Sequence, residues 1–176
     1  MARATVVFPD PLLPTTTTRL MTPIPSVVMV AGLVVQPIDS LPEDVAGLLR
    51  PSQAEGHNLV QRLVDEWNDG SNRFDGPGES IFEARVGSRL AAVGGLNRDP
   101  YLDDSEVARI RHVYVLPDRR GVGVGRALVL AMVDHARLGF TRVRLRTVRP
   151  EGSAFYLAIG FEATPSEADA THGWRL

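Results

Sequence analysis

A turn rich in glycine and arginine stands between a predicted strand and a predicted helix, and its residue types suit a phosphorylated ligand. It follows the strand that ends at Pro117, and its residues are Arg119, Arg120, Gly121, Gly123, Gly125 and Arg126. The first turn of a helix carries a partial positive charge and N–H groups without helical partners, so it binds phosphate readily. Glycine leaves these N–H groups uncovered, and arginine adds charge-assisted hydrogen bonds. The turn therefore predicts a diphosphate site.

The spacing of the glycines argues against a dinucleotide site. The dinucleotide fingerprint is G-x-G-x-x-G or ends in alanine, whereas counting from Gly121 or Gly123 places Arg126 or Leu128 in the last position. The next predicted strand also lacks the acidic residue that would bind a ribose. Two alternatives stay open at this point: a turn that serves only the fold, and a nucleotide site in another fold.

The composition excludes several classes of enzyme and ligand. The chain has 176 residues and no cysteine, and all nineteen basic residues are arginine. Disulfides, thiolate metal sites and Schiff-base lysines are therefore excluded. A net charge of −2 and 6% aromatic residues argue against a nucleic-acid partner. The four histidines are scattered without metal-ligand spacing, so we expect no metal.

Length and hydropathy predict one soluble domain with an N-terminal extension. Residues 1–30 are rich in proline and show no regular period, so we expect them to be poorly ordered, and residues 31–176 to form the domain. No apolar run approaches the ~20 residues of a membrane-spanning helix, and the first residues lack a secretory signal. We expect a cytoplasmic protein that binds no membrane. The sequence leaves the oligomeric state open, a homodimer included.

The order of the predicted elements places the turn at the end of a parallel strand pair. Two apolar-rich strands joined by Gly87-Ser88 predict a hairpin, and a third strand runs from Val107 to the turn. The helix predicted over 125–139 and the alternating strand over 141–148 complete a strand, helix and strand unit, which favours a right-handed parallel crossover. Further strands are expected over 33–38 and in a closing hairpin from 161, and further helices over 41–50, 56–69 and 150–160. The fold class expected is α+β, with a mixed sheet between two helix layers.

Two motifs together resemble the GNAT superfamily of acyl-coenzyme A-dependent N-acyltransferases. The segment Arg120–Gly125 has the pattern R-x-x-G-x-G and directly follows a V-x-P strand end at Val115–Pro117. Tyr156 stands four residues before the pair Gly160-Phe161, which is similar to a second motif of that family. The resemblance extends from residue 33 to residue 176 in the order of elements. One departure is Arg149, where the family commonly has an asparagine that contacts the coenzyme.

The resemblance implies a fold, a cosubstrate and a reaction. The fold is the GNAT-like three-layer one, with a mostly antiparallel sheet whose parallel pair is splayed by a bulge. The reaction is transfer of an acetyl group from acetyl-CoA to a primary amine of an unidentified small molecule or peptide, directly within a ternary complex and without a metal. The alternative is a catalytically weak acyl-CoA-binding regulatory domain.

The resemblance also assigns roles to residues. The loop binds the diphosphate, and the pantetheine arm pairs with the backbone of Val113 and Val115. The Val115 N–H is the candidate donor to the oxyanion, and Tyr156 is the candidate proton donor to the leaving thiolate, unless it is only a core residue. The loop residues assigned to coenzyme binding are Arg120, Gly121, Val122, Gly123, Val124, Gly125 and Arg126.

The general base is missing from the positions that the resemblance implies. Those positions hold Arg109 and Arg111, and arginine cannot accept a proton at neutral pH. We expect these arginines to bind an anionic group of the acceptor. Glu106 is the candidate base, with Asp104 and His172 as alternatives. Strand alternation predicts that His112 faces the opposite side of the sheet from its neighbours.

Acidic residues elsewhere predict a different acceptor. They lie near the expected entrance of the acceptor site and would favour a polyamine or a basic peptide end over an anionic amine, although such charges are often only solvated. They are Asp65, Glu66, Asp69, Asp75 and Glu79. The acceptor class therefore stays open.

Overall fold

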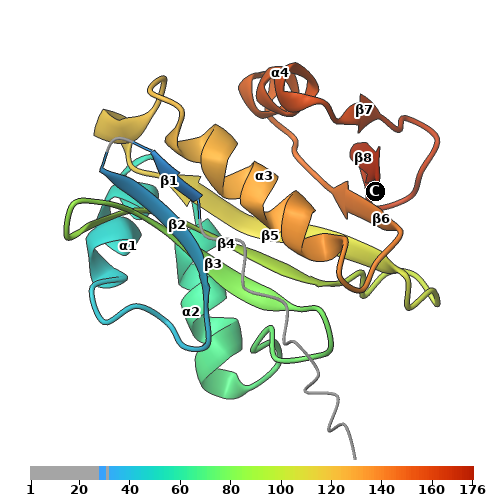
Figure 1. The fold of residues 1–176 in the computed structure, drawn as a ribbon, viewed down its shortest axis with the longest axis horizontal. Coiled ribbons are helices and arrows are strands. Elements are labelled where there is room, and N and C mark those ends of the chain that lie inside the picture. Colours follow the sequence, from blue (N-terminus) through green and yellow to red (C-terminus); the bar gives the residue numbers. More distant parts are fainter. Residues whose placement is uncertain (1–27, 31) are drawn as a thin grey trace, which may run out of the picture.

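Within the described part of the chain, one mixed sheet of eight strands organises the fold (Figure 1). The computed structural model describes residues 28–30 and 32–176, and the sheet order is β1-β2-β3-β4-β5-β6-β8-β7. The strands span β1 Val28–Val30, β2 Leu33–Ile38, β3 Ser80–Val86, β4 Arg89–Arg98, β5 Val107–Val115, β6 Arg142–Leu145, β7 Glu162–Ala163 and β8 His172–Arg175. Every neighbouring pair is antiparallel except β5 with β6. The predicted α+β class with a parallel pair is confirmed.

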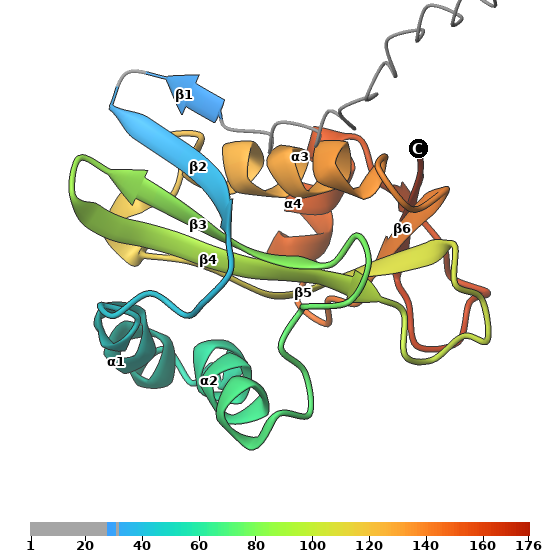
Figure 2. The same ribbon diagram turned by 60° about the horizontal axis from the view of Figure 1, so that its bottom comes forward.

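Helices cover both faces of the sheet. They span α1 Ala46–Ala54, α2 Leu59–Asp69, α3 Val124–Ala136 and α4 Pro150–Ile159. Figure 2 shows α1 and α2 on one face of the sheet and α3 on the other, which gives the three predicted layers. The helix expected over 41–50 starts later, at Ala46, and no side chain caps it. Among the residues that the structure describes, no helix is long and apolar enough to cross a membrane.

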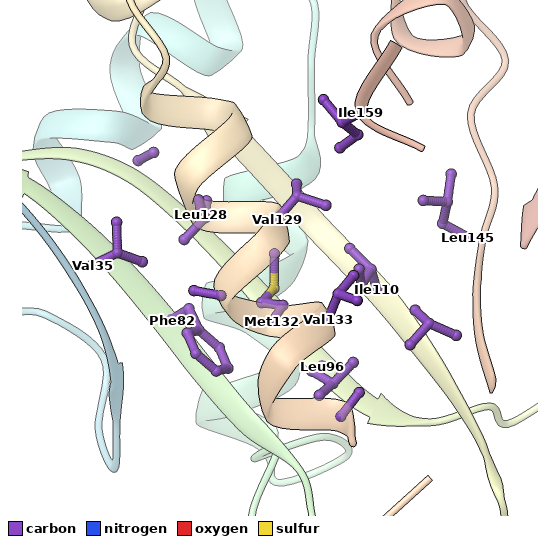
Figure 3. Close-up of a cluster of buried hydrophobic side chains, with 14 of the residues drawn as sticks. Val35, Phe82, Leu96, Ile110, Leu128, Val129, Met132, Val133, Leu145 and Ile159 are labelled. Atoms are coloured by element: carbon purple, nitrogen blue, oxygen red, sulfur yellow. The ribbon is translucent and has the colours of Figure 1, made fainter. Parts of the chain in front are cut away.

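The central helix α3 is held by a fully apolar layer. Leu128, Met132 and Val133 point from α3 toward Phe82 and Leu96 of the sheet (Figure 3). All five side chains are buried. Burial of an apolar side chain of this size stabilises a fold by about 1.5–3 kcal/mol. This layer therefore fixes α3 against β3 and β4.

The N-terminal part of the sheet partly corrects the expected domain boundary. Residues 28–30 form β1, which pairs with β2 from Val28↔Val35 to Val30↔Leu33. The last three residues of the predicted extension therefore belong to the sheet. The rest of that prediction, residues 1–27, lies outside the described residues. The predicted hairpin at Gly87-Ser88 is confirmed, with Val86 paired to Arg89.

The parallel pair is short, and its strands separate toward the glycine turn. β5 pairs with β6 only from Val107↔Arg142 to Arg109↔Arg144, although β5 continues to Val115. The strand predicted over 141–148 accordingly ends at Leu145. Among the described residues, the second half of β5 therefore has no strand neighbour on one edge, as the splayed pair requires. This opening between β5 and β6 is called the splay below.

Candidate functional site

The glycine turn exposes its backbone. A short 3₁₀ helix, Pro117–Arg119, leads into Gly121 and Gly123, whose φ angles are 75° and 92°. This left-handed region is strained for other residues, so glycine is needed here. A Cβ atom added at either position would meet nothing within 4 Å. Val122 between them is 70% exposed, so the turn forms an open backbone cradle.

The start of α3 adds unpaired N–H groups to this cradle. The first hydrogen bond of the helix runs from the Ala127 N–H to the Gly123 carbonyl at 2.9 Å. The N–H groups of Val124, Gly125 and Arg126 therefore precede the helical hydrogen-bond pattern. Anions are stabilised at such an end, where the helix dipole is also positive.

Gly125 serves packing, unlike the two glycines before it. A Cβ atom at this position would lie 3.3 Å from Cγ2 of Val115 and 3.6 Å from Cζ of Phe155. The contact brings α3, β5 and α4 together beside the splay. Within the described residues, space is therefore open at Gly121 and Gly123 but filled at Gly125, and the binding of a phosphate by these glycines stays a prediction.

The arginines of the turn differ in orientation. Arg126 is exposed and forms no ion pair within the described part of the chain, whereas Arg119 lies 3.7 Å from Asp118. Arg120 turns away from the helix start: its Nη1 and Nη2 donate to Glu55 at 2.7 and 2.8 Å, and its Nε donates to the Val115 carbonyl at 3.0 Å. The structure therefore does not bring the Arg120 guanidinium to the predicted diphosphate site.

Glu55 is the centre of a small polar network that sequence reasoning missed. Its Oε2 also accepts a hydrogen bond of 2.7 Å from the Tyr114 hydroxyl, and Arg120 stacks 5.5 Å from the Tyr114 ring. Hydrogen bonds from Arg120 and then Tyr114 lower the pKa of Glu55 to about 2. Burial and the bond to Glu55 raise the pKa of Tyr114 to about 12. Glu55 stands 65 positions from Arg120, and no motif in the sequence links them.

The Val115 backbone faces the splay. The Leu116 N–H donates to the Ala91 carbonyl of β4 at 2.9 Å. Because N–H and C=O groups alternate between the two edges of a strand, those of Val115 point to the opposite edge. The structure thus places one of the two predicted pantetheine partners at the splay. The Val113 side chain packs against Met132, on the α3 face of the sheet.

A β-bulge changes the face of His112. Gly95 pairs with Arg111 and Val93 pairs with Tyr114, so two residues of β5 oppose Gly94, and His112 adopts φ 55°. The side chains of Arg111 and His112 consequently lie on the same face and both bond Glu66 of α2, each at 3.0 Å. The prediction that His112 faces the other side was wrong, because the bulge interrupts the alternation.

The charges around Glu66 compensate one another. Burial would raise the pKa of Glu66, but His112 and Arg111 outweigh it and lower the pKa. Burial lowers the pKa of His112, and Arg111 lowers it further. The Glu66 carboxylate opposes this lowering, and Arg111 meets a negative charge within the protein.

Arg109 is also paired within the protein. Its guanidinium lies 3.3 Å from Asp99, donates to the Asp169 carbonyl at 2.6 Å and stacks 4.7 Å from the Tyr101 ring. Only 6% of Arg109 is exposed. The predicted anion clamp of Arg109 and Arg111 stays a prediction, and any acceptor anion would have to compete with these carboxylates.

The structure does not bring Glu106 to the other site residues. It precedes Val107 at the far end of β5, nine residues from Val115, which is roughly 30 Å in an extended strand. His172 is close to Tyr156, but it is buried and both of its ring nitrogens are bonded, to Ser153 at 3.0 Å and to Thr171 at 2.9 Å. Neither Glu106 nor His172 is therefore placed to act as a general base at the splay.

Tyr156 lies on α4, across the splay from β5. Its ring contacts Phe155, Phe161 and His172. Burial raises the pKa of Tyr156, so its hydroxyl stays protonated at neutral pH. The neighbouring Phe155 reaches Gly125, which ties α4 to the start of α3. Tyr156 also belongs to the buried apolar cluster around α3, so its roles as proton donor and as core residue both stay predictions.

Comparisons with known proteins relate this geometry to a family. The profile of the Acetyltransferase (GNAT) family matches residues 45–161. A solved structure from Exiguobacterium sp. 255-15, assigned as an acetyltransferase, is 29% identical with a TM-score of 0.72, over 81% of this chain and 93% of that one. An acetyltransferase from Streptococcus agalactiae 2603 is 20% identical with a TM-score of 0.65, over 82% and 99%.

A third similar structure carries the cosubstrate. YncA from Salmonella typhimurium, assigned as an acetyltransferase and solved with its cofactor acetyl-CoA, is 13% identical with a TM-score of 0.58, over 83% of this chain and 95% of that one. At this identity the likeness concerns the fold alone. No curated protein gives a significant sequence match.

Proposed function

Because the chain belongs to the GNAT acetyltransferase family, we propose that it transfers an acetyl group from acetyl-CoA to a primary amine, directly within a ternary complex. The observation that carries the proposal is the open turn of Gly121 and Gly123, which starts α3 at the end of the splayed strand β5. The acceptor is a small molecule or a peptide.

The residues at the turn fit a coenzyme A diphosphate. Gly121 and Gly123 leave room for its oxygens, and the first N–H groups of α3 are directed to the same end of the helix. Arg126 adds a positive charge without a carboxylate partner among the described residues. The bound coenzyme would supply an acetyl group activated as a thioester.

The residues at the splay fit the transfer step. The Val115 N–H would donate to the thioester oxygen as negative charge develops there, a type of stabilisation for which one donor contributes about 2.7–4 kcal/mol. Tyr156 would give its proton to the departing thiolate and regain one from solvent, and solvent would take the proton that the nitrogen loses as the amide forms. Direct transfer agrees with the absence of cysteine, which excludes a thioester on the enzyme.

The amine would reach the site in its neutral form by losing a proton to solvent. Arg109 and Arg111 occupy the strand positions of a base, and Glu106 stands at the other end of β5. Catalysis would then rest on positioning and on the oxyanion donor. A regulatory domain that binds acetyl-CoA without turnover is the second candidate, because these base positions hold arginines.

A thiol-release assay tests the proposal. The purified protein is mixed with acetyl-CoA and a panel of amines, and free coenzyme A is measured with a thiol reagent. The protein contributes no background because it has no cysteine. Amine-dependent thiol release is expected. Thermal stabilisation by acetyl-CoA without release from any amine would instead favour the regulatory domain, and displacement of coenzyme A by ATP would favour a nucleotide site.

A further inference from the structure

We propose that Glu55 and Arg120 are positioning residues that hold the Val115 peptide at the edge of β5, where its N–H would meet the thioester oxygen. The inference rests on the proposed function. It assigns Arg120 to the reacting end of the coenzyme instead of the diphosphate.

Arg120 is fixed by three hydrogen bonds that leave its guanidinium one orientation. Both terminal nitrogens donate to the two carboxylate oxygens of Glu55, at 2.7 and 2.8 Å. The guanidinium is planar, so this bidentate contact also sets the direction of Nε–H. That third donor points to the Val115 carbonyl at 3.0 Å. Glu55 thus controls Val115 through Arg120.

The peptide that joins Val115 to Leu116 is consequently held at both ends. Its N–H donates to the Ala91 carbonyl of β4 at 2.9 Å, and its C=O accepts from Arg120 on the opposite side. Rotation of this peptide would break one of the two bonds. Because the Val115 N–H lies on the same strand edge as the Val115 C=O, a fixed carbonyl keeps that N–H directed into the splay.

Glu55 is in turn fixed from the sheet. The Tyr114 hydroxyl donates to its Oε2 at 2.7 Å, and Tyr114 is only 3% exposed. The strand residue next to Val115 therefore orients the carboxylate that orients Arg120. The hydrogen bonds thus form a closed chain that runs from Tyr114 of β5 to Glu55 at the end of α1, and through Arg120 back to Val115 of β5.

A role in stability alone does not account for the arrangement. The side chains of Arg120 and Glu55 are 44% and 29% exposed, and exposed ion pairs contribute little to folding. A diphosphate ligand would need Arg120 at the start of α3, where Glu55 does not hold it. If Arg120 positions Val115, loss of its ion pair with Glu55 should lower kcat and leave coenzyme affinity unchanged. If Arg120 binds the diphosphate, the same loss should strengthen coenzyme binding.

The test is the kinetics of Glu55→Gln, which keeps the size of the side chain and removes its charge. With the best amine found for the wild type, kcat is expected to fall about 10- to 100-fold, the scale for a misplaced catalytic group. The Kd of coenzyme A, measured by calorimetry, is expected to stay near the wild-type value. Arg120→Lys is expected to show the same loss, since one ammonium cannot reproduce the planar fork.

Asp44→Asn is the matched control. It breaks another bidentate pair between the α1 side of the molecule and the sheet, with Arg85 at 2.8 and 3.0 Å, away from the turn. Its kcat is expected to equal that of the wild type. Circular dichroism melting establishes that each variant is folded. If Glu55→Gln does not fold, the kinetics of Arg120→Lys are used as the test instead.

Three results would overturn the inference. A kcat of Glu55→Gln equal to that of Asp44→Asn would remove the positioning role and leave the proposed function intact. Tighter coenzyme binding by Glu55→Gln at unchanged kcat would make Arg120 a diphosphate ligand. A wild-type protein that releases no thiol with any amine would overturn the proposed function and this inference together.

Discussion

Replacement of Gly123 by alanine tests whether this glycine is needed for ligand binding or only for the backbone conformation of the turn. Gly123 has φ 92°, and a Cβ atom there meets no protein atom within 4 Å. The substitution therefore lowers the stability of the protein only through backbone strain, by about 1–2 kcal/mol for a non-glycine residue in this region. The same methyl group would occupy the cradle beside the first N–H groups of α3. It would therefore displace a bound diphosphate.

The loss of one hydrogen bond to a charged group costs about 1.5–3 kcal/mol, which corresponds to roughly 10- to 150-fold in the Kd of coenzyme A. Gly70→Ala is the control. Gly70 ends α2 with φ 77°, and its added Cβ would only touch Arg73 at 3.8 Å. Both variants should lose similar unfolding free energy in urea, but only Gly123→Ala should lose coenzyme affinity by calorimetry. Equal affinity in the two variants would refute the assignment of the turn.

Three further predictions concern other parts of the site. Tyr156→Phe is expected to lower kcat by ~10²-fold with little change in coenzyme affinity, and equal losses in both would contradict a proton-donor role. The pKa of Glu55 falls from 4.5 to about 2 on folding, so the small contribution of this partly exposed ion pair to stability should be complete above pH 4.5 and disappear as the pH falls through about 2. Urea titrations of the wild type and Glu55→Gln should therefore converge in acid. Asp99→Asn leaves Arg109 and Arg144 without their buried carboxylate, and urea unfolding should show a loss of about 3–5 kcal/mol.

The elements and the turn could be predicted because they depend on local pattern. The hairpin at Gly87-Ser88 and the strand, helix and strand unit around α3 follow from periodicity and turn chemistry, and they are confirmed. His112 could not be placed in this way, because one extra residue in β5 reverses every face after it. The register shift is a property of the β4 and β5 pair, and neither strand shows it alone.

The partners of the arginines were equally beyond sequence reasoning. Arg120 meets Glu55 at the end of α1, Arg111 meets Glu66 of α2, and Arg109 meets Asp99. The first two of these carboxylates lie far earlier in the chain. Ion pairs between distant residues depend on tertiary contacts that no spacing encodes. Glu55 directs the Arg120 guanidinium away from the predicted diphosphate site, and the predicted anion clamp of Arg109 and Arg111 stays a prediction.

Residues 98–149 contain more arginines than acidic residues, and ion pairs within the protein neutralise most of this positive charge. Arg144 of β6 pairs with Glu167 at 2.9 Å, and Arg146, just after β6, pairs with Asp169 at 3.7 Å. Within the described residues, the arginines of this segment that form no ion pair are Arg126 and Arg149, in the first turn of α3 and at the start of α4. The contact of Phe155 with Gly125 holds these two helices together beside the splay. Uncompensated charge and helix N-termini thus coincide where the proposed coenzyme would lie, which composition alone could not indicate.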